Sequence, residues 1–271
     1  MSNSAEDGKL STVEYQEKLA TGISTGIMTY FQEKETVAPR QKLEKNNSPI
    51  AVRVNNYMKK YPGMGQQEAL WKIKLNLDKP EFVQAKVLTK EELASSIVIV
   101  NKRYRVPDDY KPNDLVSLTG RVSLRAEAKT AFDQMTAAAK SQGYRITPVS
   151  GYRSVAYQHC LYQCYLRSDS RYIVDTYSAR AGFSEHHTGM AIDVAGSNGS
   201  MSNFGATKEF AWVKENASRY GFIIRYLPDT QYITGYKNEP WHLRYVGTAV
   251  AEEMKAQRIK TLEEYVGKFL W

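Results

Sequence analysis

The stretch SEHHTGMAIDV, residues 184–194, places two adjacent histidines directly before a short run with the alternation of a β-strand. Gly189 marks a turn that leads into this strand. Successive side chains of a strand point to opposite faces, so Ala191 and Asp193 share one face while Ile192 points to the other. The pattern predicts that Ile192 enters a core and that Asp193 points into a site.

A second segment, NEPWHLRY (238–245), holds a further histidine beside an acid. The chain has four histidines, and only His159 lies outside these two segments. Zinc binds neutral imidazole nitrogens and carboxylate oxygens, and a catalytic zinc site keeps three protein ligands and one open position. Two histidines, one aspartate and a spare glutamate match that set, although spacing alone leaves open whether His186 or His187 takes part.

Glu239 and His242 are three residues apart and would face opposite sides of a regular strand. Pro240 cannot donate a hydrogen bond to a neighbouring strand and belongs at a strand start or edge. We therefore expect a kinked backbone that lets Glu239 and His242 approach one site from different angles.

The remaining pattern mixes helices and strands without strict alternation, which indicates an α+β fold with a small antiparallel sheet flanked by helices and a helical N-terminal extension. Strands are expected at 95–102, 144–154, 189–194, 222–226 and 241–246, and helices at 123–143, 156–167, 208–220, 248–258 and 261–269. The helix at 123–143 carries an apolar stripe of Leu124, Ala128, Phe132, Met135 and Ala139.

The N-terminal third is more polar and less regular. It suggests a flexible or weakly helical segment over 1–46, with a possible helix over 13–34, then a small helical accessory segment over 47–84. The catalytic domain is expected to cover 85–271.

Charge, hydropathy and cysteine content give expectations about the partners and the location of the protein. The 271 residues carry a formal net charge of +8 with no outstanding basic cluster, so nucleic acid is not an expected partner. No stretch approaches the roughly 20 apolar residues of a membrane span, and the N-terminus lacks the pattern of a signal peptide. The protein is expected to be cytoplasmic or to begin after a removed export signal. Cys160 and Cys164 are expected to be half-buried, unbridged thiols on one helix.

The two histidine segments resemble a known family. SEHHTGMAID fits the pattern S-x-H-x-x-G-x-A-x-D, and EPWHLRYVG fits E-x-W-H-x-R-Y-V-G, of VanY-type D-alanyl-D-alanine carboxypeptidases. SGYRS (150–154), followed by Gln158, looks like the family's substrate-binding stretch. The resemblance covers roughly residues 85–260 and places the chain in the group that includes lysostaphin-like peptidases and the hedgehog signalling domain.

The resemblance implies one zinc ion per chain and a role for each matching residue. It assigns zinc binding to His186, Asp193 and His242, proton transfer to Glu239, and substrate binding to Arg153, Gln158 and Ser184. His187 falls on a variable position and is expected to be a neighbour of the site. Trp241, Arg244 and Tyr245 are expected to support the fold.

The function that the resemblance implies is removal of the C-terminal D-Ala from peptidoglycan stem peptides by a monomeric protein of the cell envelope or the extracellular space. L,D-carboxypeptidase action on tetrapeptide stems and peptidoglycan endopeptidase action share the same motifs. A non-catalytic wall-binding module with a structural zinc and a cytoplasmic regulatory protein are the alternatives from other classes.

Overall fold

The computed structural model describes residues 48–270. The chain divides into two units between Asn56 and Tyr57, within helix α3 (Pro49–Lys60). The helix expected over 13–34 lies outside the described residues. The compact unit from Tyr57 onward contains every residue that was assigned to the site, and the description below concerns this unit.

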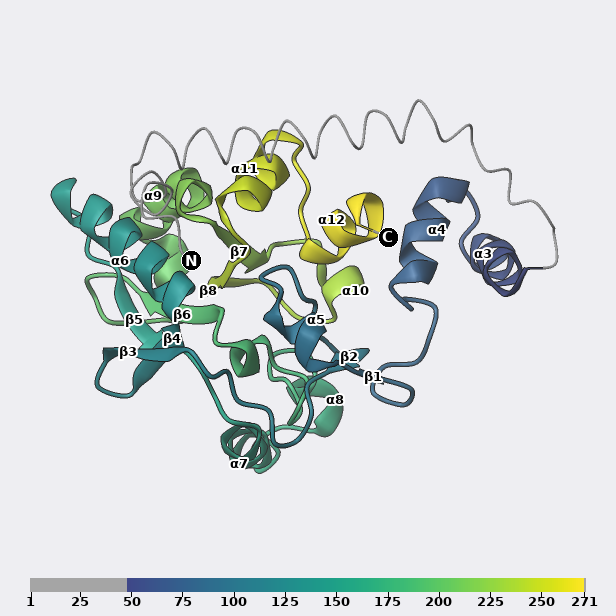
Figure 1. The fold of residues 1–271 in the computed structure, drawn as a ribbon, viewed down its shortest axis with the longest axis horizontal. Coiled ribbons are helices and arrows are strands. Elements are labelled where there is room, and N and C mark those ends of the chain that lie inside the picture. The colour runs from purple at the N-terminus through teal and green to yellow at the C-terminus, as the bar shows by residue number, and fades with distance from the viewer. Residues whose placement is uncertain (1–47, 271) are drawn as a thin grey trace, which may run out of the picture. The chain divides into compact units, whose positions relative to one another are not determined.

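A four-stranded sheet forms the centre of the unit (Figure 1). Its strands are β5 (Thr147–Ser150), β6 (Ala191–Ala195), β8 (Glu239–Tyr245) and β7 (Phe222–Tyr226), in that spatial order, and every neighbouring pair is antiparallel. Helices surround this sheet. The predicted α+β class with a small antiparallel sheet is therefore confirmed.

Shorter strands and helices complete the unit. The strand pair β1 (Lys86–Val87) and β2 (Tyr104–Arg105) is parallel, and the pair β3 (Leu115–Thr119) and β4 (Val122–Arg125) is antiparallel. The helices are α4 (Gln66–Lys74), α5 (Lys90–Ala94), α6 (Ala126–Ser141), α7 (Val155–Tyr165), α8 (Arg171–Val174), α9 (Lys208–Asn216), α10 (Gln231–Thr234), α11 (Thr248–Ala256) and α12 (Leu262–Phe269), with 3₁₀ turns η1 (Glu185–Thr188), η2 (Phe204–Ala206) and η3 (Ala217–Tyr220).

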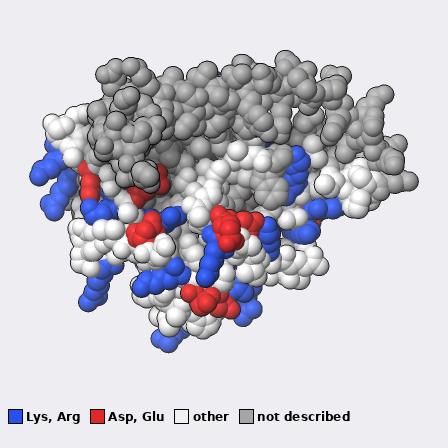
Figure 2. All heavy atoms as spheres, in the orientation of Figure 1, with Lys and Arg blue, Asp and Glu red and all other residues white. Residues whose placement is uncertain are grey.

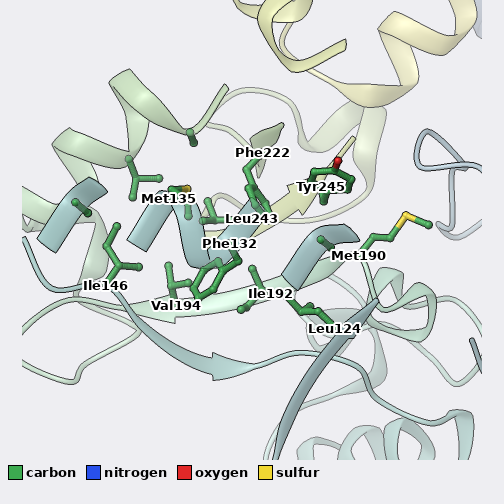
Figure 3. Packing of buried hydrophobic residues seen from close by; sticks show 14 of the residues in the cluster. Leu124, Phe132, Met135, Ile146, Met190, Ile192, Val194, Phe222, Leu243 and Tyr245 are labelled. Carbon is green, nitrogen blue, oxygen red and sulfur yellow. The ribbon is translucent and has the colours of Figure 1, made fainter. Parts of the chain in front are cut away.

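One face of the sheet is apolar and packs against α6 and α9. Phe132 and Met135 of α6 meet Ile192 and Val194 of β6 and Leu243 of β8 (Figure 3). All five side chains are almost completely buried. Burial of such side chains contributes roughly 1.5–3 kcal/mol each, so this cluster is a main source of stability for the sheet.

The opposite face of the same strands is polar. Because neighbouring residues alternate between faces, Asp193, Arg225, His242 and Arg244 point away from the apolar cluster. All four are buried. Both faces of the sheet therefore carry buried side chains, but only one face is apolar.

A second apolar cluster joins α4, α11 and α12. Trp71 of α4 and Leu75, which directly follows α4, are buried in this cluster. Gly267 of α12 packs against both, and a Cβ atom at this position would collide with them. Helix α4 falls within the range expected to be an accessory segment, yet it shares this core with the C-terminal helix.

The strand expected at 95–102 is not formed, and that prediction was wrong. Val98, Ile99 and Val100 are buried as expected, but their segment makes turns and one isolated bridge. The carbonyl oxygens of Ser96 and Val98 accept hydrogen bonds from Arg244 Nη2, at 2.8 and 2.9 Å. A side chain satisfies carbonyls that a neighbouring strand would otherwise satisfy.

The helix expected to begin at 123 begins at Ala126, because 122–125 pair with β3 as strand β4. The stripe predicted for this helix is nevertheless buried throughout, with Leu124 contributing from the strand.

The face drawn in Figure 2 carries mixed charge, because basic and acidic side chains of the described residues lie interspersed on it. Among residues 48–270, no helix combines the length and apolar character needed to cross a membrane. Cys160 and Cys164 lie on α7 as unbridged thiols, but both are exposed, so the expectation of half-buried thiols was wrong.

Candidate metal centre and active site

The polar face of the sheet brings together two histidines and one aspartate. Asp193 of β6 and His242 of β8 lie directly opposite each other in the strand register, and His186 comes from the turn η1. The distance from Asp193 Oδ2 to His186 Nε2 is 3.2 Å, and from Asp193 Oδ1 to His242 Nδ1 it is also 3.2 Å. One ligand atom from each residue lies within 4.8 Å of the others, and all three residues are buried.

The turn that carries His186 is shaped by its two ends. The Ser184 side chain accepts a hydrogen bond from the backbone N–H of His186, and Gly189 closes the turn in the left-handed conformation at φ 69°. A Cβ atom at Gly189 would lie 2.9 Å from a methyl carbon of Leu115, so glycine is required both for its backbone angle and for space. This local chemistry folds His186 back over β6.

The three side chains fit a divalent cation by their donor chemistry. His186 Nδ1 lies 2.7 Å from the carbonyl oxygen of Gly151, which fixes the tautomer and leaves Nε2 directed at Asp193. Asp193 Oδ1 is buried and has no hydrogen-bond partner. A buried, unpartnered carboxylate oxygen between two imidazoles is the arrangement that a zinc ion with two nitrogen ligands and one oxygen ligand completes.

The charges around the three residues shift their pKa values in different directions. Burial raises the pKa of Asp193, but His186 and His242 outweigh it and hold this pKa well below its usual range. Burial disfavours a charge on His242, yet the carboxylates of Asp193 and Glu185 raise its pKa to about 9. By contrast, burial and the Arg153 charge lower the pKa of His186 to about 4, so this imidazole is neutral and able to act as a ligand.

Glu239 reaches the same place by the backbone irregularity that the sequence predicted. Ile224 pairs with Leu243, whereas Tyr226 pairs with Glu239, so β8 contains two extra residues relative to β7. The resulting bulge directs Glu239 toward the ligand group, with Oε2 3.7 Å from His242 Nδ1. Burial raises the pKa of Glu239 to about 7, while the nearby charge of His242 opposes the rise.

A cavity of about 370 Å³ opens onto these groups. Arg153, Ser184 and Glu239 line it together with the three ligand-type residues. The Arg153 guanidinium contacts the Asp193 carboxylate through Nη2 and donates from Nε to Ser150 Oγ at 2.9 Å. The residues that the sequence assigned to the site therefore all line this cavity, with a single exception.

Gln158 is that exception, since it is not among the residues lining the cavity. It is buried on α7, and its amide nitrogen donates to the Ala179 carbonyl oxygen at 2.8 Å. Its Oε1 atom has no hydrogen-bond partner. Ala179 itself lines the cavity, so Gln158 lies one residue behind the wall.

His187 is a structural neighbour of the site. It is fully buried, its Nε2 accepts a hydrogen bond from the Gly182 N–H at 3.1 Å, and its Nδ1 lies 2.7 Å from the Arg153 carbonyl oxygen. Both ring nitrogens are therefore occupied by backbone groups. The fold-supporting roles expected for Arg244 and Tyr245 also agree with their burial and with hydrogen bonds to backbone and to Glu127.

Sequence reasoning missed the aromatic wall of the cavity and the acid beside the ligands. Tyr226 and Tyr236 line the cavity, and the Tyr226 ring centroid lies 4.9 Å from that of His242. Glu185 is buried with its Oε2 atom 3.5 Å from His242 Nε2. No local pattern marked the tyrosines, whereas Glu185 stood inside the quoted motif at a variable position.

Comparison with known proteins gives the same picture. The family model described as VanY, D-alanyl-D-alanine carboxypeptidase, matches residues 121–248. YodJ of Bacillus subtilis (strain 168) is 40% identical over 184 residues, which cover 64% of this chain and 67% of YodJ. The chain belongs to the VanY-type carboxypeptidase family.

Solved structures of VanY-type and related carboxypeptidases share the fold. The LdcB LD-carboxypeptidase, a structure that addresses peptidoglycan recognition, matches with a TM-score of 0.62 and 37% identity over 70% of this chain and 92% of its own. A mutant of the vancomycin resistance D,D-pentapeptidase VanY in complex with Zn(II) matches with a TM-score of 0.56 and 30% identity, over 63% of this chain and 98% of its own. Zinc is thus the metal that suits the His–Asp–His group of this VanY-type chain.

Proposed function

We propose that this protein is a zinc-dependent D,D-carboxypeptidase that removes the C-terminal D-Ala from peptidoglycan stem peptides. The observation that carries the proposal is the convergence of His186, Asp193, His242 and Glu239 on one buried cavity. Family membership and the similarity to the D,D-pentapeptidase VanY support the same chemistry.

The three ligands bind the metal in this proposal, and the acid transfers protons. Zinc, when bound, lowers the pKa of a water molecule and polarises a substrate carbonyl. Glu239, which lines the cavity beside His242, would accept a proton from that water. Glu239 then gives the proton to the departing amine nitrogen of D-Ala. His186, Asp193 and His242 would hold the metal.

Arg153 supplies the preference for a chain end. A guanidinium offers a planar fork of donors that suits a carboxylate. Its position on the cavity wall, beside Asp193, supports binding of the terminal carboxylate of the stem peptide close to the scissile bond. Ser184 lines the same wall, and we assign it to substrate binding. Gln158 lies behind the wall, so we assign it an indirect role, in which its hydrogen bond to the Ala179 carbonyl oxygen supports the substrate-binding wall.

L,D-carboxypeptidase action on tetrapeptide stems is the second candidate. A specific observation favours it, since identity to the LdcB LD-carboxypeptidase is 37% whereas identity to the D,D-pentapeptidase VanY is 30%. Both reactions release a C-terminal D-Ala and differ in the residue that precedes it. The same ligands, Glu239 and Arg153 serve either reaction.

We further propose that the protein acts at the cell envelope or outside the cell as a monomer. In this proposal the catalytic domain covers 85–271, and the segments 1–46 and 47–84 connect or support it. The relation of LdcB to peptidoglycan recognition supports a role at the cell wall.

Mass spectrometry of muropeptide digests tests the assignment. Purified full-length protein is incubated with pentapeptide and tetrapeptide muropeptides, each with and without a chelator such as 1,10-phenanthroline. Loss of one alanine from pentapeptides that stops with chelator and returns with added Zn²⁺ is expected. Loss from tetrapeptides alone would select the L,D reaction, cleavage inside the stem or cross-bridge would indicate an endopeptidase, and no cleavage of any substrate would refute enzymatic function.

A further inference from the structure

Behind the metal ligands lies a closed group of four charged side chains. Glu185, Arg225, Arg244 and Glu263 come from η1, β7, β8 and α12, and their side chains are 0% exposed. Two carboxylates and two guanidinium groups balance in formal charge. The function proposed above uses none of the four, although one of them touches a metal ligand.

Glu185 forms the end of this group that faces the site. Its Oε2 atom lies 3.5 Å from His242 Nε2, and both atoms are buried without a hydrogen-bond partner. An N–H···O hydrogen bond is usually 2.7–3.2 Å long, so a movement of a few tenths of an ångström joins them. His242 Nδ1 faces Asp193 on the other side of the ring. Glu185 is therefore the acceptor toward which the second nitrogen of this imidazole points.

Arg225 fixes the position of Glu185. Its Nε donates to Glu185 Oε1 at 2.7 Å, and Arg244 Nη1 lies 3.1 Å from the same oxygen. With Oε1 hydrogen-bonded to Arg225 and in ion-pair contact with Arg244, Oε2 is left to face His242. The orientation of the Glu185 carboxylate thus depends on the position of the Arg225 guanidinium.

Glu263 in turn fixes Arg225. Its two oxygens accept hydrogen bonds from Arg225 Nη1 and Nη2 at 2.8 and 2.7 Å, a bidentate arrangement. Asn101 Nδ2 donates to Glu263 Oε1 at 3.2 Å and holds it from the far side. Buried charge networks often contribute little to stability compared with apolar packing, so stability alone gives a poor account of this one.

We propose that Glu263, in the first turn of the C-terminal helix, is a positioning residue for the metal ligand His242, acting through Arg225 and Glu185. The inference rests on the proposed role of His242 in binding zinc. Glu263 balances the charge of Arg225 and keeps its fork in place, so that Glu185 presents Oε2 to the imidazole. Partners that orient a metal-binding histidine typically change metal affinity by 10–100-fold when altered.

The test compares Glu263→Gln with Glu264→Gln in the full-length protein. Glutamine keeps the size of Glu263 but removes its charge and places an NH₂ group against the Arg225 fork. Glu264 neighbours it on the same helix, and its carboxylate forms an ion pair with Lys268 near the surface, so its variant is a matched control. Zinc dissociation constants come from competition with a chromogenic chelator, the Co²⁺-substituted proteins give absorption spectra, and thermal melts are recorded with and without zinc.

We expect Glu263→Gln to bind zinc at least about tenfold more weakly than the wild type. Its Co²⁺ absorption bands should be shifted, and zinc should raise its melting temperature by less than it raises that of the wild type. Glu264→Gln should match the wild type in all three. If Glu263→Gln lowers the melting temperature equally with and without zinc and leaves zinc affinity and the Co²⁺ spectrum unchanged, the residue is structural and the proposal fails.

A second variant covers the case in which Glu263→Gln does not fold. Asn101→Ala removes one neutral donor from Glu263 and leaves all four charges, so a smaller weakening of zinc binding is expected, and unchanged affinity would overturn the proposal. The wild-type measurement separates the two levels of inference. If wild-type protein itself binds no zinc, the proposed metal site is wrong, whereas equal binding by the wild type and the variants refutes only the positioning role.

Discussion

The two faces of the central sheet are built from the same strands, but one face forms the apolar core and the other forms the candidate metal site. On one face Ile192 and Leu243 pack against Phe132 of α6. On the other face their chain neighbours Asp193 and His242 stand opposite each other with His186 beside them. A shift of one residue in register would exchange the two sets of side chains.

Strands β6 and β8 therefore meet two different structural requirements, one on each face. The apolar face requires volume and shape, because dispersion and burial have little directional preference. The polar face requires a partner in a given direction for each buried polar atom, because an unsatisfied group costs free energy. Changes on the apolar face should therefore act on stability, and changes on the polar face on metal binding and turnover.

The largest effect is expected from removal of a ligand. His242→Ala should lose zinc and, with it, all measurable carboxypeptidase activity, because the metal supplies the activated water and loses one of three protein ligands. Metal content by atomic absorption and alanine release from muropeptides measure both quantities. His159→Ala is the control, since this histidine is exposed on α7 outside the cavity. Full zinc content in His242→Ala would contradict the ligand assignment.

Loss of the acid should separate turnover from metal binding. Glu239→Gln is expected to lower kcat by about 10²–10⁴-fold, the usual contribution of a positioned acid or base, while zinc stays bound. Rates on muropeptides and metal content are compared with Glu252→Gln, a change at an exposed glutamate of α11. Wild-type turnover in Glu239→Gln would mean that another group carries the proton.

The apolar face should respond in free energy of unfolding. Phe132→Ala removes an aromatic ring that is 1% exposed and should lower the free energy of unfolding by about 3–5 kcal/mol. Denaturant titration measures the change, and the zinc affinity and kcat of the folded protein should remain near those of the wild type. Tyr172→Ala, at a side chain 81% exposed, serves as the control with an expected change within about 0.5 kcal/mol. A change in kcat alone in Phe132→Ala would break the division between the two faces.

The smallest effect is expected at the edge of the polar face. Arg153→Lys keeps a positive charge but loses the planar fork, so KM should rise by about tenfold for a substrate with a free terminal carboxylate. The same substrate with an amidated C-terminus measures the difference, because the variant and the wild type should then be alike. An equal loss on both substrates would indicate that Arg153 acts through its contact with Asp193 instead.

Several features of the fold could be predicted from local sequence because their causes are local. The strand at 222–226 and the helix stripe that includes Phe132 follow from periodicity over a few residues. The kink at Glu239 followed from Pro240 and the odd spacing to His242, and the register confirms it. The strand predicted at 95–102 failed because Arg244, far along the chain, takes the carbonyl groups that a neighbouring strand would have used.

What the sequence by itself determined was the kind of groups able to hold a metal, because two short motifs collect three histidines and the acids Asp193 and Glu239. The resemblance to the VanY-type family then selected His186 over His187 as the ligand from the first motif. Only the tertiary structure decided what surrounds them, namely the tyrosines of the cavity and the path from His242 through Glu185 and Arg225 to Glu263. The physical reason is that a ligand's chemistry belongs to its own side chain. The partner of a buried charge, in contrast, is set by which distant segments pack together, and no local period in the sequence records that choice.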